Sequence, residues 1–410
     1  MKKFLALIIA LVMALSLVAC GEQKQPDTPD VPDDGQQTAT VKVGFITLHD
    51  ENSTYDLNFI NAAKEAIANL GLTDADYILK TNVPEGQECY ETAMDLVDEG
   101  CNIIFADSFG HEPYMIDAAK KHPEVQFCHS TGTRAHTEGL ANYHNAFASI
   151  YEGRYLAGIA AGMKMNEMIE AGKFTADEAK MGYVGAFTYA EVVSGYTSFY
   201  LGAKSVCPTV TMDVTFTGSW YDETLEKEGA EKLIQGGCKL ISQHADSLGA
   251  PTACENAGVP NVSYNGSTKD ACPNTFIVSS RIDWAPYYEM CIKAVMDGTE
   301  IPADWTGTLA TGSVVLTDVN EAAAAAGTAE AIAAATEKLE KGEIHVFDCA
   351  NFTVKGETLT SYQADVNADS DNTPDTEVVH DGYFSESEFR SAPYFDLEID
   401  GITRLDVNFG

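Results

Sequence analysis

The chain has 410 residues, a length that suits two or three domains, each with its own hydrophobic core. Hydrophobic residues make up 45% of it, which excludes an intrinsically disordered protein. With 25 Lys and Arg against 62 Asp and Glu, the net charge is −37, and such an acidic surface excludes nucleic acid as a partner because it repels phosphates.

The N-terminal segment reads as an export signal. Lys2 and Lys3 precede an apolar stretch that is too short to span about 30 Å of hydrocarbon. The stretch ends in LVACG, where small residues precede Cys20 as in bacterial lipoprotein signals. We therefore expect residues 1–19 to be a lipoprotein signal peptide and Cys20 to be lipidated; the alternative is an ordinary signal peptide with a chance cysteine. Residues 20–40, rich in Pro and Asp, predict a disordered acidic tether.

From residue 41 onward, short apolar runs alternate with amphipathic helical patterns, which predicts parallel sheets built from βαβ units. A long helix at about 150–170 separates two series of expected strands. The first series is Val41–Leu48, Tyr77–Leu79, Cys101–Ala106, Val125–Cys128 and Leu140–Tyr143, and the second is Met181–Gly185, Val210–Phe216, Lys239–Ser242, Val259–Ser263 and Phe276–Ser279. A helix near Tyr288–Met296 then returns to the first series, with Ser313–Leu316 as a strand beside it. We also expect a helix over Glu321–Lys341 and a strand over Ile344–Phe347.

Several runs resemble the basic membrane protein (BMP) family, the purine-nucleoside-receptor-like lipoproteins that serve ABC importers. The longest is GSWYDETLEKEGAEKLIQGGCKLISQHADS, and further matches lie at Tyr151–Met165, Gly182–Lys204 and Ser279–Tyr288. The resemblance spans roughly residues 41–350. It implies an α/β fold of two doubly wound parallel-sheet lobes joined by a hinge of three crossings, as in type I periplasmic binding proteins. Lobe 1 would comprise 41–148 plus about 281–325, and lobe 2 would comprise 149–280 plus about 326–354.

The C-terminal extension, residues 355–410, falls outside the resemblance. Its aromatic residues predict that it docks on the body of the protein: Tyr383, Phe384, Phe389, Tyr394 and Phe395. The run from Asp365 to Asp371 superficially matches a calcium loop, but Ser370 replaces the glycine and Thr376 replaces the bidentate Glu. We favour a solvated acidic loop there and predict neither a metal nor a cofactor.

The resemblance implies a solute-binding protein that is lipid-anchored outside the cytoplasm and delivers a purine nucleoside or nucleobase to an ABC permease. Alternatives are the same fold carrying a flavin or a sugar, or a sensor or surface lipoprotein without transport. An enzyme is not expected, because GxSxG, HExxH and phosphate-loop motifs are missing from the sequence.

Candidate ligand-binding residues follow the predicted strands, because loops at the carboxyl ends of strands surround the ligand in open α/β sheets. Aromatic rings would stack on a purine, and carboxylates or amides would fix its orientation. Glu191 and Tyr221 lie in the same loops. The candidates are Tyr55, Asn58, Asp107, Phe109, Phe187, Trp220, Asp222, His244, Asp246, Ser247, Tyr264, Asn265, Arg281 and Trp284.

Structural interpretations compete with these assignments. Trp220 could belong to a core between the lobes. Asp246 and Asp107 could cap helices, and Asp222 fits the N-cap of the following helix. His244 could be a structural histidine, and Arg281 could pair with acidic residues at the hinge. Nine cysteines follow Cys20, an odd number, and those in apolar patterns, Cys101, Cys128, Cys238 and Cys291, fit core positions.

Overall fold

The computed structural model describes residues 40–367 and 376–406. The predicted signal peptide, Cys20 and nearly all of the predicted tether lie outside the described residues, as does the second half of the proposed calcium loop. Within the described part, no helix is long and apolar enough to cross a bilayer.

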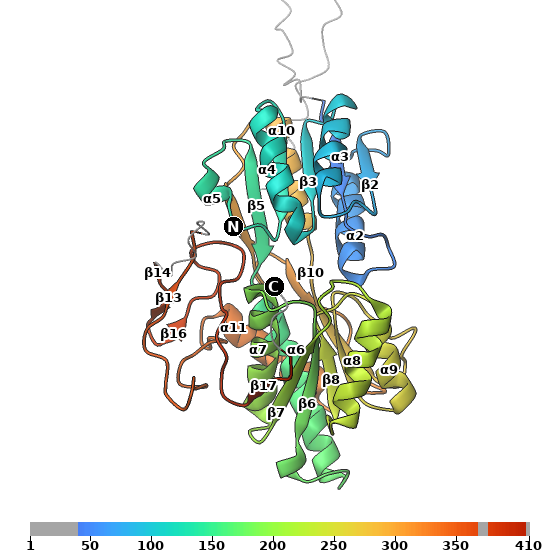
Figure 1. Ribbon diagram of the computed structural model, residues 1–410, viewed down its shortest axis with the longest axis vertical. Helices are drawn as coiled ribbons and strands as arrows, with labels where there is room; N and C mark the ends of the chain where they lie inside the picture. Colours follow the sequence, from blue (N-terminus) through green and yellow to red (C-terminus); the bar gives the residue numbers. More distant parts are fainter. Residues whose placement is uncertain (1–39, 368–375, 407–410) are drawn as a thin grey trace, which may run out of the picture. The chain divides into compact units, whose positions relative to one another are not determined.

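The first lobe is a parallel sheet in the strand order β11-β5-β4-β3-β1-β2. Its strands are β1 (Val43–Ile46), β2 (Tyr77–Lys80), β3 (Ile103–Ala106), β4 (Gln126–Ser130), β5 (Tyr143–Ala148) and β11 (Asp304–Gly307). Helices cover both faces because alternate strand residues point in opposite directions: Ile103 and Phe105 pack with α2 (Thr54–Asn69) and α10 (Ala285–Asp297). On the other face, Ile104 and Ala106 pack with α3 (Gln87–Asp98) and α4 (Glu112–Lys121). Figure 1 shows this lobe in its upper half.

The second lobe has the strand order β12-β10-β9-β8-β6-β7-β17, in which only the β10–β12 pair is antiparallel. Its strands are β6 (Lys180–Gly185), β7 (Thr211–Phe216), β8 (Leu240–Gln243), β9 (Asn261–Tyr264), β10 (Phe276–Ile282), β12 (Val314–Leu316) and β17 (Ile402–Arg404). One face carries α6 (Ile150–Glu170) and α7 (Ala190–Val206), and the other carries α8 (Glu223–Gln235) and α9 (Gly249–Ala257). Glycines let α6 and α7 approach closely, since a Cβ at Gly158 would lie 2.1 Å from the Phe199 carbonyl oxygen. The predicted class, two doubly wound lobes, is therefore confirmed.

The chain passes between the lobes three times, from β5 to α6, from β10 to α10 and from β11 to β12. We expected Ser313–Leu316 in the first lobe, but β12 pairs with β10 in the second sheet, so the third crossing comes well before residue 325. The strand that returns to the first lobe is β11, beside β5, and its sequence DWTG has no apolar run that would have revealed it.

Two other expected elements differ from the structure. Ile344–Phe347 forms no strand; Val346 and Phe347 are instead buried in the second lobe's core from an irregular segment. The helix expected from Glu321 begins only at Thr328, as α11 (Thr328–Glu340), because Gly327 adopts a left-handed conformation with φ 81°. The nine cysteines of the described part are buried free thiols, and the four that we assigned to the core are among them.

The C-terminal extension docks on the second lobe, as its aromatic content predicted. Phe384, Tyr394 and Phe395 are buried in that lobe's core, and Phe389 is exposed. Strand β17 lies parallel to β7 at the sheet edge. Figure 1 shows the extension in orange and red beside α7 and α11. It also contains four two-residue strands, β13 (Gln363–Ala364), β14 (Thr376–Glu377), β15 (Val379–His380) and β16 (Tyr383–Phe384).

No group of three His, Cys, Asp or Glu side chains in the described ranges could hold a metal ion.

Candidate ligand-binding site

A cavity lies where the carboxyl ends of the two sheets face each other, and it is a narrow slot of about 360 Å³ that is partly open to solvent. Residues of the first lobe form one wall: Leu48, Tyr55, Asp56, Ser108, Phe109 and Thr131. Residues of the second lobe form the other: Glu191, Trp220, His244, Asp246, Tyr264 and Asn265.

The two walls touch each other around the slot. The backbone N–H and the hydroxyl of Thr54 both donate to the carbonyl oxygen of Asp246, at 3.0 and 3.1 Å. The rings of Phe109 and Tyr189 lie 5.1 Å apart across the same boundary. A ligand larger than a few waters therefore needs the lobes or side chains to separate before it can enter.

Aromatic side chains give the slot an apolar wall. Trp220 is half-buried and stands edge-to-face on Phe187, at 4.9 Å between ring centroids, and Phe187 stacks on Tyr189 at 5.2 Å. Gly218, with φ 73°, turns the chain after β7 in a left-handed conformation that few other residues adopt, and this turn presents Trp220 to the cavity. Tyr55 enters from α2, and its hydroxyl donates to the Asp107 carbonyl oxygen at 2.7 Å.

Carboxylates supply the polar side of the slot. Burial by itself would raise the pKa of Asp56, but hydrogen bonds from His49 and Ser53 lower this pKa below its usual value and keep the carboxylate ionised. Burial and the nearby charge of Asp56 raise the pKa of Asp246 well above its usual range. Asp246 accepts a hydrogen bond from the side chain of Asn265 at 3.3 Å.

Behind this wall lies Asp107, which is 1% exposed. Burial, and then the charge of Asp56, raise the pKa of Asp107 well above its usual range. Its Oδ1 accepts a hydrogen bond from the Leu48 backbone N–H at 3.1 Å, whereas its Oδ2 has no protein partner.

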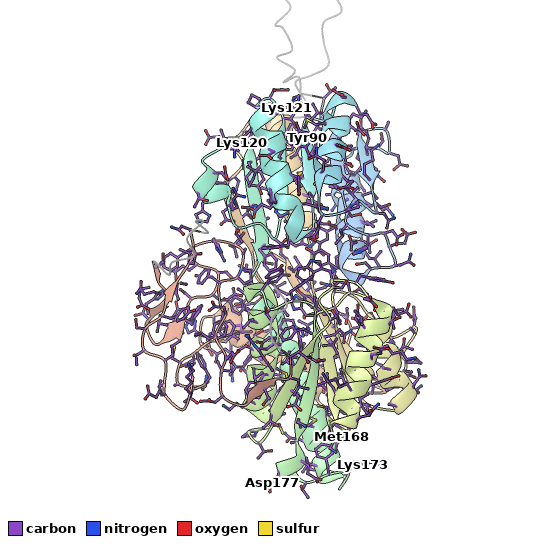
Figure 2. The ribbon with its side chains drawn as sticks, in the orientation of Figure 1. Tyr90, Lys120, Lys121, Met168, Lys173 and Asp177 are labelled. Carbon is purple, nitrogen blue, oxygen red and sulfur yellow. The ribbon has the colours of Figure 1, made fainter. Side chains whose placement is uncertain are left out.

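Among the residues that the structure describes, no Lys or Arg lines this cavity. Lysines labelled in Figure 2, Lys120 and Lys121 of the first lobe and Lys173 of the second, lie at the outer ends of the lobes, far from the slot. The site therefore combines stacking surfaces with hydrogen-bond acceptors, and it suits a planar ligand that carries N–H or O–H donors.

The structure brings half of the predicted residues together on the cavity wall. These are Tyr55, Phe109, Trp220, His244, Asp246, Tyr264 and Asn265. Phe187 and Asp107 lie directly behind this wall. Asn58 and Arg281 line a neighbouring groove, where Asn58 approaches Asn265 at 3.5 Å and Arg281 pairs with Asp283 at 3.3 Å.

Three predicted residues do not reach the cavity. Asp222 is the N-cap of α8 and accepts from the backbone N–H groups of Thr224 and Leu225. The backbone N–H of Ser247 donates to the Glu226 carboxyl group, and the Ser247 hydroxyl accepts from the Gly249 N–H. Trp284 is 1% exposed and stacks on Phe59 in the first lobe's core at 4.6 Å. Each lies close in sequence to a strand end, but its side chain points toward a helix or a core.

Sequence reasoning missed Leu48, Asp56, Ser108 and Thr131. Ser108 follows β3 by two positions, and Thr131 follows β4 directly, so the strand-end rule applied to every strand would have found both. Leu48 also follows β1 by two positions, but the expected strand Val41–Leu48 included it. Asp56 gave no such signal, because its role depends on how the loop after β1 folds back on α2.

Comparison with known proteins places these features in a family. Residues 44–348 match the Bmp family, described as PnrA-like ABC transporter substrate-binding proteins. A purine-binding protein of Brucella abortus is 32% identical over 262 residues, which cover 63% of this chain and 70% of that protein. A putative ABC transporter glucose-binding protein of Haloferax volcanii is 33% identical over 207 residues, about half of each chain.

A solved structure has the same fold. The ABC transporter solute-binding protein of Aeropyrum pernix superposes with a TM-score of 0.60 at 19% identity, covering 75% of this chain and 93% of that one. At this identity, the likeness concerns the fold alone.

Proposed function

Because the chain belongs to the Bmp family of PnrA-like ABC transporter substrate-binding proteins, we propose that it binds a purine nucleoside or nucleobase between its lobes and delivers it to an ABC permease. The observation that carries the proposal is the slot itself, which joins aromatic walls to carboxylate acceptors. The purine-binding relative from Brucella supports the same ligand class.

In this proposal the purine ring lies against Trp220, with Phe109 and Tyr55 on the opposite wall. Stacking of a base on an aromatic ring is worth about 1–3 kcal/mol. The carboxylate of Asp56 and the side-chain oxygens of Glu191 and Asp246 accept hydrogen bonds from ring N–H, amino or ribose hydroxyl groups. The two lobes then close over the ligand by hinge motion at the three crossings.

A sugar is the second candidate, favoured by the glucose-binding name of the Haloferax relative. Sugar hydroxyls also donate to carboxylates, and the apolar face of a pyranose packs on Trp.

The deciding experiment is a thermal-shift screen followed by calorimetric titration. The ligands are adenosine, guanosine, inosine, adenine, hypoxanthine, riboflavin and glucose. A ligand present at a hundred times its Kd should stabilise the folded protein by about 2.7 kcal/mol and raise its Tm. Stabilisation by one or more purines supports the proposal. Stabilisation by glucose or riboflavin alone, or by none of these ligands, would reject it.

We also propose that the protein works outside the cytoplasm, anchored through lipid on Cys20. Acyl chains would supply most of its membrane affinity, since about 0.8 kcal/mol accompanies each buried CH₂ group. Cys20→Ser should therefore appear in the soluble fraction after cell fractionation, with the wild-type protein in the membrane fraction. A variant that still sediments with membranes would contradict the anchor.

A further inference from the structure

A buried glutamate lies between the two loops of the second lobe that carry Trp220 and Asp246. Glu226 is on α8 and is 0% exposed. It shares the buried face of this helix with Ala230 and Leu233, which pack with α9 in an apolar cluster. An apolar residue would therefore be expected at position 226 as well. Burying a carboxyl group is costly unless it is hydrogen-bonded, so the hydrogen bonds of Glu226 should explain its presence.

The carboxyl group of Glu226 accepts hydrogen bonds from the backbone of both loops. The Asp222 N–H, in the loop after β7, donates to Oε1 at 3.1 Å. The Ser247 N–H, in the loop after β8, lies 3.2 Å from Oε1 and 3.1 Å from Oε2. One oxygen, Oε1, is thus within hydrogen-bond distance of both loops. We call this set of hydrogen bonds the Glu226 brace.

The two loops follow strands that do not pair with each other, because β6 lies between β7 and β8 in the sheet. A hydrogen bond links them directly, from the Asp246 N–H to the Trp220 carbonyl oxygen at 3.1 Å. Trp220 lies two residues before Asp222, and Asp246 directly precedes Ser247. The brace therefore holds each loop next to the residue that faces the slot.

The first turns of α8 and α9 give the brace a tightly packed base. A Cβ at Gly249, the first residue of α9, would lie 2.2 Å from the Glu223 carbonyl oxygen, so a glycine is needed for this close approach. Figure 1 shows α8 and α9 side by side in the second lobe. The Asp222 side chain caps α8 by accepting from two backbone N–H groups of its first turn. Glu226 thus reaches the loops from a helix pair that leaves little room for movement.

Both loops extend from the brace to the ligand slot. Trp220 and Asp246 line the slot. The Asp246 carbonyl oxygen also accepts from the N–H and the hydroxyl of Thr54 in the first lobe, at 3.0 and 3.1 Å. A shift of one loop against the other would therefore separate the stacking ring from the carboxyl group and disturb a contact with the first lobe.

We propose that Glu226 is a positioning residue for the ligand site, which holds the loops of Trp220 and Asp246 in a fixed relative position so that a ligand meets the ring and the carboxyl group together. This inference rests on the proposed function for the identity of the ligand, whereas the coupling of the two loops is a property of the unliganded protein. Two simpler roles compete with it: stabilisation of α8 alone, and an effect of the Glu226 charge on Asp246.

The test compares two substitutions at position 226 with a matched control. Glu226→Gln has no charge but keeps an oxygen that can accept from both loops. Glu226→Met has a side chain of similar length without an oxygen, and it suits the apolar face of α8. The control is Glu255→Met: Glu255 of α9 accepts from the Asn274 and Thr275 N–H groups at 3.2 and 3.1 Å, but these lie at the amino end of β10, at the sheet edge opposite the slot.

Hydrogen exchange of the Asp246 amide measures the coupling without a ligand, because its acceptor is the Trp220 carbonyl oxygen and not Glu226. We expect exchange at least about tenfold faster than wild type in Glu226→Met, and within about threefold of wild type in Glu226→Gln and Glu255→Met. Unchanged exchange in Glu226→Met would overturn the proposal. Equal acceleration in the Gln and Met variants would assign the effect to charge and would overturn it too.

Calorimetric titration with adenosine, guanosine, inosine, adenine and hypoxanthine connects the brace to the ligand site. The Kd of each purine that binds wild type should rise about tenfold in Glu226→Met and stay near the wild-type value in Glu226→Gln and Glu255→Met. A folded Glu226→Met with a lower Tm and an unchanged Kd would show that Glu226 only stabilises its helix, and this would overturn the positioning role.

If Glu226→Met does not fold, Glu226→Asp decides. Its carboxyl group is one methylene shorter and cannot reach both loops, so the Asp246 amide should again exchange faster than in wild type. Wild-type exchange in Glu226→Asp would overturn the proposal. Failure of the wild-type protein to bind any of the purines would reject the proposed function and leave amide exchange to decide whether Glu226 couples the loops.

Discussion

At the scale of single residues, the candidate site makes its sharpest prediction at Trp220. The side chain is half-buried on the cavity wall and contacts Phe187. Trp220→Ala should weaken purine binding by about 1–3 kcal/mol, roughly ten- to a hundredfold in Kd. Asp246→Asn keeps the shape of the side chain but replaces one carboxyl oxygen with an amide nitrogen that can only donate, so it should also lower affinity with little change in Tm.

Calorimetric titration of both variants, beside their unliganded melting curves, checks this prediction. A tryptophan that served only the core would cost about 3–5 kcal/mol of stability on truncation. Unchanged purine affinity in Trp220→Ala, together with a large fall in Tm, would return this residue to a structural role.

Glu386 predicts a specific pH dependence of stability. It is buried in the extension, where the hydroxyls of Ser194 and Ser387 donate to it, and burial raises its pKa to about 7 from 4.5. Between these values the folded state retains a proton that the unfolded state releases, so this group's contribution to stability falls as pH rises from about 4.5 to about 7. The loss is on the order of 1–3 kcal/mol, at about 1.4 kcal/mol per pKa unit.

Glu386→Gln isolates this contribution, since the amide stays neutral at every pH. The variant's Tm, relative to wild type, should be higher at about pH 8 than at about pH 5. A Tm difference that is the same at both pH values would show that Glu386 does not titrate between them.

At the scale of elements, the extension completes the second sheet. The Met212 N–H of β7 donates to the Gly401 carbonyl oxygen at 3.0 Å, and the Leu405 N–H donates to the Val214 carbonyl oxygen at 2.8 Å. Truncation after Asp400 removes β17 and turns β7 into an edge strand. Hydrogen exchange of the Met212 amide should then accelerate at least about tenfold, because its acceptor is lost.

The amide of Ile241 provides the internal control, because β8 lies between β6 and β9 and this amide donates to the Pro260 carbonyl oxygen. Its exchange should stay close to that of the full chain. Equal protection of Met212 in both proteins would mean that β17 does not protect the edge of β7 in solution.

At the scale of the whole folded unit, the extension links the two lobes. It belongs to the second lobe through β17, yet described residues of the extension also bond to the first lobe. The His136 Nε2 lies 2.9 Å from the Val366 carbonyl oxygen, and the Ser391 N–H donates to Asp304 Oδ2 at 2.9 Å. These contacts add a non-covalent link to the three chain crossings, so the extension should resist lobe opening.

His136→Ala combined with Asp304→Ala should loosen this link. We expect a larger radius of gyration for the unliganded double variant than for wild type in small-angle scattering, and a decrease for both proteins on saturation with ligand. Thr353→Val is the control, because Thr353, just before the extension, donates to Asp400 and takes part in neither contact with the first lobe. An unliganded radius equal to that of wild type would argue that the extension does not restrain the hinge.

Residues that are neighbours in the chain specify the local elements, and their order along the chain specifies the fold class. The apolar run of β8, the cap at Asp222 and the stop at Gly236-Gly237 depend on neighbours in the chain, so patterns of a few residues predict them. The order of the family's motifs supplied the two-lobe architecture. The strand-end rule also gathered seven of the twelve residues that line the slot, because the carboxyl ends of parallel strands must lie along one edge.

Tertiary structure alone decided where individual side chains go. Trp284 and Trp220 both follow predicted strands, but one stacks in a core and the other lines the slot. Patterns along the chain also did not reveal that β12 joins the second sheet or that the extension reaches the first lobe. In each case the partner lies far away in the chain, and the outcome depends on which surfaces pack together, which local periodicity does not encode.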